Sequence, residues 1–130
     1  MPTFLVTGSN RGIGLEYCRQ LQARGDQVIA VCRTPSPELE ALGVRLEAGI
    51  ELTAEADLAV LVQRLAGQPL EGVILNAGIL EGNRLDNLDS DSLRRQFEVN
   101  ALAPLRLVAA LLPNAARFQA GADDQPHGLD

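Results

Sequence analysis

The chain has 130 residues, of which 46% are hydrophobic and 22% are charged, values typical of a single folded domain. Its formal net charge is −6 and it has no run of basic residues, so we expect neither nucleic acid nor an anionic membrane surface as a partner. No apolar run approaches the roughly 20 residues of a membrane helix, and the first residues lack the features of a signal peptide, so a cytoplasmic location is expected.

The first half of the chain alternates between predicted strands and helices. Residues 3–7 form an apolar, β-branched run that leads into glycine, which predicts a buried strand. The apolar residues Ile13, Tyr17, Cys18 and Leu21 then recur at helical spacing until Gly25, a residue suited to the left-handed end of a helix. A second apolar strand is predicted at residues 27–32, and a short helix at residues 38–42 follows two prolines.

The second half repeats this alternation. A third strand is predicted at residues 44–47, and Thr53 is expected to cap a helix with an apolar stripe at positions i, i+3, i+4 and i+7. Gly67 ends that helix. A fourth strand is predicted at residues 72–76, and residues 79–89 are expected to form a loop.

A long helix is predicted over residues 90–112. Its apolar residues fall on roughly one side of the helix: Leu93, Phe97, Ala101, Leu105, Val108 and Leu112. Pro104 is expected to kink the helix, because proline has no backbone N–H to donate. The polar residues 119–130 are expected to form a disordered tail, which leaves residues 1–118 as the folded domain.

The order of these elements predicts an α/β fold with a doubly wound parallel sheet. Uniformly apolar strands that alternate with helices indicate a parallel sheet covered on both faces. Right-handed crossovers and one reversal of direction give the strand order 3-2-1-4. A ligand crevice is expected at that reversal, where the first and fourth strands end side by side.

The turn after the first strand reads TGSNRGIG over residues 7–14 and predicts a phosphate-binding turn. Gly8 permits a tight exit from the strand, Gly12 lets a diphosphate approach the backbone, and Gly14 lets the helix lie close to the sheet. The spacing differs from GxGxxG, so the residues alone leave two alternatives open: a nucleotide site or a plain glycine-rich turn.

This turn resembles the TGxxxGxG motif of the short-chain dehydrogenase/reductase family. Asn76-Ala77-Gly78 resembles the family's NAG motif, and residues 97–101 (FEVNA) resemble the segment that carries its structural and catalytic Asn. Residues 100–106 further resemble a carbonyl-reductase-like branch that includes the bacterial C-signal and insect sniffer proteins. The resemblance covers residues 1 to about 113 and implies a Rossmann-type NAD(P)-binding domain, here incomplete.

The resemblance implies a set of cofactor-binding residues and one catalytic residue, Asn100. The implied cofactor contacts are Gly8, Ser9, Asn10, Arg11, Gly12, Ile13, Gly14, Arg33, Glu51, Leu52, Asn76, Ala77 and Gly78. Glu51 stands where the family usually has an Asp that contacts the adenine. Asn76 has an alternative role in binding neighbouring backbone, and Asn100 has one in interrupting its helix.

NADP is the expected cofactor, in preference to NAD. An acidic residue after the second strand would bind the ribose 2′-hydroxyl of NAD and repel the 2′-phosphate of NADP. Arg33 stands there instead, and Arg11 lies in the glycine turn. Two guanidinium groups favour a phosphate, and the alternative is that both are solvated surface residues.

Most of the family's catalytic residues have no counterpart in this chain. The family uses a Ser and a Tyr-x-x-x-Lys, whereas the sequence contains no Lys at all. The implied parent activity is NADP-dependent oxidoreduction of carbonyls and alcohols, with the chain alone expected to be inactive and to represent an amino-terminal half. The alternatives are a non-catalytic dinucleotide-binding or regulatory module, and a non-functional remnant or a subunit completed by another chain.

Two further features concern partners. Cys18 and Cys32 are too few for a zinc site and are expected to be buried thiols, so no metal is predicted. The apolar side of the predicted helix at residues 90–112 is a candidate surface for a homo-oligomer. A small carbonyl or alcohol substrate is expected only for a full-length relative.

Overall fold

The computed structural model describes residues 1–79, 81–82 and 84–115 and contains one parallel sheet. Its strands are β1 (Thr3–Thr7), β2 (Gln27–Val31), β3 (Arg45–Glu47) and β4 (Gly72–Ile74). They lie in the order β3-β2-β1-β4, with Leu5 opposite Ile29 on one side and Val73 on the other. The predicted α/β fold and strand order are confirmed.

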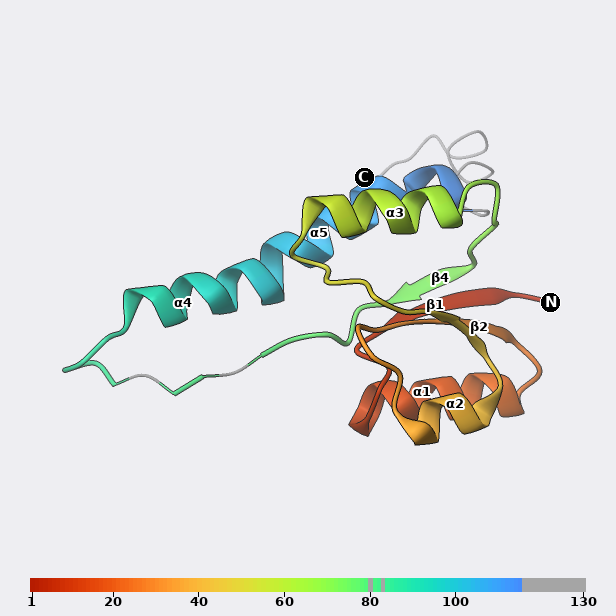
Figure 1. The fold of residues 1–130 in the computed structure, drawn as a ribbon, viewed down its shortest axis with the longest axis horizontal. Helices are drawn as coiled ribbons and strands as arrows, with labels where there is room; N and C mark the ends of the chain where they lie inside the picture. Colours follow the sequence, from red (N-terminus) through yellow and green to blue (C-terminus); the bar gives the residue numbers. More distant parts are fainter. Residues whose placement is uncertain (80, 83, 116–130) are drawn as a thin grey trace, which may run out of the picture.

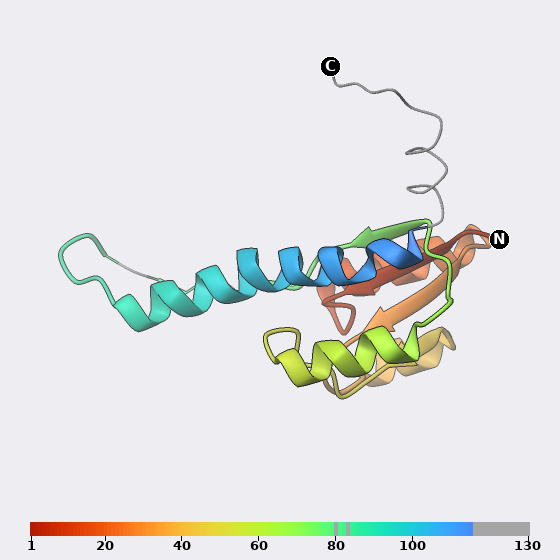
Figure 2. The same ribbon diagram turned by 90° about the horizontal axis from the view of Figure 1, so that it is seen from above.

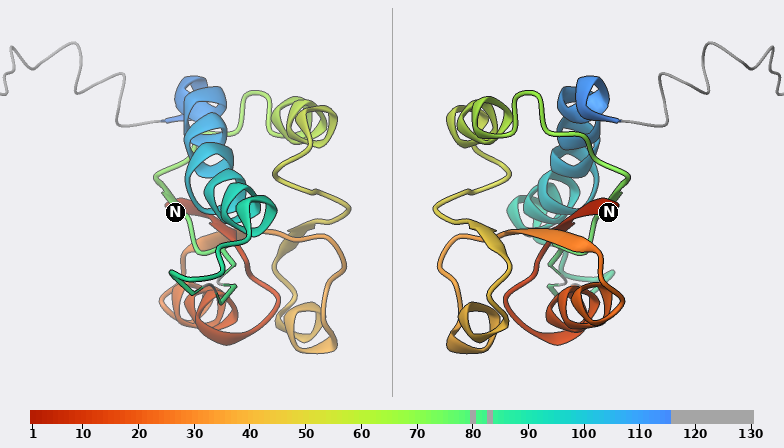
Figure 3. Two further views of the ribbon diagram at one scale, coloured as in Figure 1. Left: turned by 90° about the vertical axis from the view of Figure 1, so that its left-hand side faces the viewer. Right: turned by 90° about the vertical axis from the view of Figure 1, so that its right-hand side faces the viewer.

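Helices cover both faces of this sheet (Figures 1 and 3). The helices α1 (Gly12–Ala23) and α2 (Pro37–Leu42) lie on one face, and α3 (Glu55–Arg64) and α5 (Ala103–Leu111) lie on the other. Successive strand residues point to opposite faces, so β1 contributes Leu5 to the core under α3 and α5 and Val6 to the core over α1 and α2. Both β1 side chains are completely buried.

Two local predictions about helix positions were wrong. Thr53 does not cap α3, whose N-cap is Ala54; the Thr53 hydroxyl donates instead to the Glu51 carboxylate over 2.9 Å. Ile13, predicted on the apolar face of α1, is 67% exposed, because Gly14, Leu15 and Cys18 turn inward in its place.

The predicted helix at residues 90–112 is interrupted in the structure. It consists of α4 (Ser90–Phe97), a π-helical turn η1 (Glu98–Leu102), α5, and a 3₁₀ turn η2 (Leu112–Asn114). The distortion therefore precedes Pro104, which sits in the first turn of α5 where a missing N–H is tolerated. The whole column extends well beyond the sheet (Figure 2).

The apolar stripe predicted on this column lies in solvent. Phe97 is 59% exposed and Leu105 is 66% exposed, and the core contacts are made by other residues of α5, including Leu107 and Leu111. Because α4 extends past the sheet, no strand of the described residues lies beneath it to receive an apolar face. The buried polar residue Asn114 fixes the far end of the column by donating to the Leu65 carbonyl over 2.7 Å.

The segment that leads into α4 is held against the helix by Glu81. Its carboxylate accepts from the Ser92 hydroxyl over 2.6 Å and from the Arg95 guanidinium over 3.0 Å. These two hydrogen bonds lower the pKa of the Glu81 carboxyl below its usual value, and the one from Ser92 contributes more than the one from Arg95. The tail predicted at residues 119–130 lies outside the described residues.

Candidate functional site

A cleft of about 680 Å³ opens at the carboxyl ends of the strands. Five chain segments line it: the turn after β1, the end of β2, the segment after β3, the turn after β4, and the junction of η1 and α5. The first four lie at the ends of the four strands, because parallel strands finish at the same edge of a sheet. The cleft therefore lies where the reversal of strand order predicted a crevice.

The glycine turn between β1 and α1 is built on close backbone contacts. Gly8 has φ +61°, and a Cβ added there would meet the Ala77 nitrogen at 2.8 Å. A Cβ added to Gly14 would meet the Gly8 carbonyl oxygen at 1.9 Å. The first turn of α1 is thus pressed against the exit of β1, as the sequence predicted for Gly14.

The first backbone amides of α1 are accessible from the cleft, as binding of an anionic group there would require. Gly12 has φ +57°, and an added Cβ would find no atom within 4 Å. No side chain caps the helix and its first turn has no acidic residue, whereas α2 is capped by Ser36. Unpaired amides and the positive end of a helix dipole attract phosphate, so these residues fit the diphosphate of a dinucleotide.

Two sets of hydrogen bonds hold the glycine turn in place. The Thr7 hydroxyl accepts from the Asn76 and Ala77 amides over 3.0 and 3.1 Å, and the Asn76 side-chain amide donates to the Gly8 carbonyl over 3.3 Å. This second contact is the backbone-binding role that the sequence left open for Asn76. The turn after β4 is thereby fixed to the turn after β1.

Ser9 and Asn10 connect the glycine turn to the end of β2. The buried Ser9 hydroxyl donates to the Val31 carbonyl over 3.1 Å. The Asn10 side chain donates to the Thr34 carbonyl and accepts from the Ser36 amide over 2.8 Å. Both polar side chains therefore have protein partners, and they set the position of the segment that carries Arg33.

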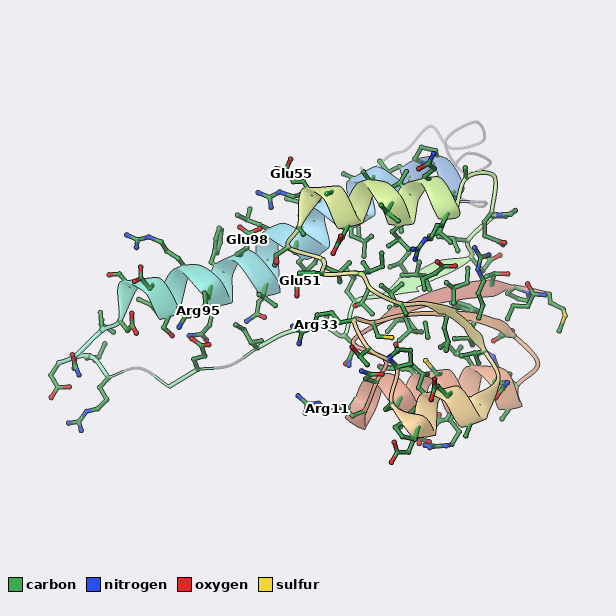
Figure 4. The ribbon with its side chains drawn as sticks, viewed as in Figure 1. Arg11, Arg33, Glu51, Glu55, Arg95 and Glu98 are labelled. Carbon is green, nitrogen blue, oxygen red and sulfur yellow. The ribbon has the colours of Figure 1, made fainter. Side chains whose placement is uncertain are left out.

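The charged residues of the cleft lie at its open edge (Figure 4). Arg11 and Arg33 are both exposed, and their side chains lie on the side of the molecule where the strands end. Arg33 is 3.5 Å from the Glu51 carboxylate, with side-chain exposures of 78% and 42%. Within the described residues, Arg11 makes no ion pair.

Asn100 joins the column of helices to the turn after β4. It lies in η1, and its side-chain amide pairs with the backbone of Ile79: the Ile79 N–H donates over 2.8 Å and the Ile79 carbonyl accepts over 2.7 Å. A Cβ added to Gly78 would meet the Asn100 Oδ1 at 3.0 Å. The helix interruption considered for Asn100 is present, and its side chain positions the cleft wall.

The structure brings eleven of the fourteen sequence-predicted residues to the cleft wall: Gly8, Ser9, Asn10, Arg11, Gly12, Arg33, Glu51, Leu52, Asn76, Ala77 and Gly78. The other three, Ile13, Gly14 and Asn100, are not part of the cleft lining. Sequence reasoning missed Thr7 and Cys32. Burial raises the pKa of the Cys32 thiol, so Cys32 contributes an uncharged side chain to the cleft lining at neutral pH.

A second hollow, of about 370 Å³, lies at the opposite, amino-terminal edge of the sheet. Its lining includes Thr3, Gln27 and Gly43, and it has no glycine turn at a helix start. Among the described residues, no group of three or more His, Cys, Asp or Glu side chains is placed to hold a metal ion. None of the helices in this part of the chain combines the length and apolar character needed to cross a bilayer.

Comparison with known proteins agrees with this geometry. The family model described as short chain dehydrogenase matches residues 2–122. The chain belongs to the short-chain dehydrogenase family. The oxidoreductase family and the Rossmann-type fold expected from the sequence are thereby confirmed, and a nicotinamide dinucleotide is the class of cofactor that this fold takes.

The relatives within this family include several reductases and dehydrogenases. The chain is 38% identical over 115 residues to 1-hydroxy-2-glutathionyl-2-methyl-3-butene dehydrogenase of a Rhodococcus species. That alignment covers 87% of this chain and 51% of the relative. It is 33% identical, with a TM-score of 0.72, to NADPH-bound carbonyl reductase from chicken fatty liver, covering 88% of this chain and 51% of that one.

A solved carbonyl reductase from Pseudomonas aeruginosa is 31% identical in sequence to this chain, and the two structures align with a TM-score of 0.82. The alignment covers 90% of this chain and 58% of the solved one. These similarities favour the carbonyl-reductase branch that residues 100–106 indicated. The chain spans about half the length of the curated relatives it matches.

Proposed function

We propose that this chain binds NADP(H) in the cleft and supplies the cofactor-binding half of a carbonyl or alcohol oxidoreductase. The observation that carries the proposal is the cleft itself, which joins an uncapped helix start, two exposed guanidinium groups and the turn after β4. The 33% sequence identity to a carbonyl reductase that was solved with NADPH bound supports the proposal.

Each segment of the cleft has a proposed role toward the cofactor. The amides beside Gly12 hold the diphosphate, and Ala77 and Gly78 leave room for a ribose. Arg33 and Arg11 bind the 2′-phosphate that distinguishes NADP from NAD. When bound, the nicotinamide ring supplies hydride transfer, and the residues of this chain bind and orient the cofactor.

The chain by itself is proposed to have negligible turnover. It contains no lysine, so a Tyr-x-x-x-Lys pair is absent from it, and Asn100 is the one member of the family's catalytic set that it retains. A missing general acid commonly costs about 10² to 10⁴ in rate. A small carbonyl or alcohol substrate is therefore proposed only for a full-length relative.

The proposed cofactor preference is tested by titrating NADPH and NADH into the protein at low salt. NADPH is expected to bind at least about tenfold more tightly, because a charge-assisted hydrogen bond contributes roughly 1.5 to 3 kcal/mol and tenfold corresponds to about 1.4 kcal/mol. The variant Arg33→Asp is expected to lose this preference. Because NADPH is fluorescent and the protein has no tryptophan, the binding signal is free of indole emission.

Arg84→Asp is the matched control for this experiment. Arg84 is 79% exposed, close to the 78% of Arg33, and pairs with Asp86 on the segment before α4. This control makes the same charge change away from the cleft and is expected to keep the NADPH preference. Equal affinity of the unmodified protein for NADPH and NADH would contradict the proposed preference.

A further inference from the structure

The segment after β3 lies directly beside the end of β2 because their backbones remain hydrogen-bonded beyond the strands. The Ile50 amide donates to the Cys32 carbonyl over 3.2 Å, and the Gly49 amide donates to the Arg33 carbonyl over 2.8 Å. Glu51 follows immediately. Its position next to Arg33 is therefore set by the sheet rather than by the two flexible side chains.

The Glu51 carboxylate is shared between two partners on the cleft wall. Its Oε1 lies 3.5 Å from the Arg33 guanidinium, and its Oε2 accepts from the Thr53 hydroxyl over 2.9 Å. The Glu51 amide in turn donates to the Asp57 carboxylate over 2.9 Å, which fixes the backbone below the carboxylate. Thr53 and Asp57 thus hold the negative charge where it faces Arg33.

Arg11 and Arg33 consequently differ in their electrostatic surroundings. Arg33 already has an intramolecular counter-ion at the cleft edge, whereas Arg11 has no ion pair within the described part of the chain. A phosphate that approaches Arg33 meets both the guanidinium and the adjacent carboxylate, and it must compete with the carboxylate for the same positive charge.

We infer that Glu51 sets the strength of the preference for NADP over NAD by acting as a competing counter-ion for Arg33. This inference rests on the proposed function, since it concerns the 2′-phosphate that distinguishes the two dinucleotides. The Arg33–Glu51 pair is exposed, so a bound phosphate can displace it, but its attraction must be overcome and the carboxylate repels the phosphate. Glu51 therefore weakens NADP binding selectively and leaves NAD binding nearly unchanged.

The test is a calorimetric titration of NADP⁺ and of NAD⁺ into the unmodified chain and Glu51→Gln. Glutamine keeps the acceptor for the Thr53 hydroxyl and removes the charge. NADP⁺ is expected to bind about three- to tenfold more tightly to the variant, and NAD⁺ to change by less than about twofold. The gain should shrink as salt is added, because exposed charges are screened. Thermal unfolding checks that the variant folds as the parent does.

Two controls separate the counter-ion role from its alternatives. Glu55→Gln makes the same change at an exposed residue of α3 that lies away from Arg33 (Figure 4), and it is expected to leave both affinities within about twofold. In an Arg33→Gln background, Glu51→Gln is expected to give less than half of its original fold-gain, because the competing pair no longer exists.

Four outcomes overturn the inference. If Glu51→Gln weakens both dinucleotides equally, Glu51 is an adenine contact and not a counter-ion. If it leaves the affinity for NADP⁺ unchanged, or if Glu55→Gln has the same effect, the pair does not tune the site. If the unmodified chain binds neither dinucleotide, the proposed function fails and this inference fails with it, a result distinct from the other three.

Discussion

At the scale of single residues, the cleft depends on backbone contacts that only glycine permits. A Cβ on Gly14 would lie 1.9 Å from the Gly8 carbonyl oxygen and 2.8 Å from the Asn76 side-chain nitrogen. Backbone atoms of a strand exit cannot yield as a flexible side chain can. The glycine at position 14 therefore determines how closely α1 approaches β1, and with it where the open start of the helix lies.

Gly14→Ala is expected to destabilise the protein by about 2 to 3 kcal/mol, the upper part of the usual range for overpacking, because the added Cβ would meet backbone atoms. Chemical denaturation followed by circular dichroism measures this change in the free energy of unfolding. Gly12→Ala is the comparison variant, because its Cβ would meet no atom within 4 Å and its cost is the positive φ alone, about 1 kcal/mol. Equal destabilisation by the two variants would contradict the assigned role of Gly14.

Sequence reasoning identified the residues whose role follows from their own chemistry. The positive φ of Gly8 and Gly12 is a property of glycine, and the motif placed both correctly. Thr7 was missed, because its hydroxyl acts on the amides of Asn76 and Ala77, about 70 positions away in the chain. Glu51 was assigned to the cleft, but its pairing with Arg33 depends on the register of β2 and β3, which the sequence does not specify.

At the scale of elements, the column formed by α4, η1 and α5 combines a buried and an exposed part. Only α5 has the sheet and α3 beside it, so its buried residues include Leu107 and Leu111, while Phe97 of α4 and Leu105 of α5 remain in solvent. Exposed apolar side chains aligned along a helix are typical of an interaction surface. This is the helix for which the sequence suggested a homo-oligomer.

Self-association through this stripe is expected to be lost in Phe97→Glu/Leu105→Glu. Burying charges in an apolar contact should weaken it at least tenfold, equivalent to about 1.4 kcal/mol. Sedimentation velocity at several protein concentrations measures the association, and Val60→Glu on α3, where Val60 is 39% exposed, is the control. A parent protein that sediments as a monomer at every concentration would contradict this expectation.

The interruption of the column shows why helix periodicity alone was insufficient. The pattern of apolar residues over residues 90–112 is continuous, so it predicted one helix and a kink at Pro104. The structure instead widens the turn at residues 98–102, where Asn100 binds both backbone groups of Ile79. The distortion coincides with a contact to another segment, which a periodicity pattern does not contain, and π turns are frequent at functional sites.

At the scale of the whole molecule, the strand order β3-β2-β1-β4 and the site followed from pattern and chirality. Apolar strands, right-handed crossovers and one reversal suffice to place the ends of β1 and β4 side by side. The sequence did not predict the size of the cleft, the hydrogen bonds made by its polar side chains, or the hollow at the opposite edge. These features depend on how side chains from separate elements meet.

The most direct test of the central claim is an amide chemical-shift map of the ¹⁵N-labelled protein titrated with NADP⁺. The dinucleotide site predicts the largest shifts at residues 8–14, Arg33 and residues 76–78, and none at Gly43 or Val44 in the opposite hollow. Saturation is expected below about 1 mM, a free energy of about −4 kcal/mol. Shifts confined to the opposite hollow, or no shifts at that concentration, would contradict a dinucleotide site at the carboxyl edge of the sheet.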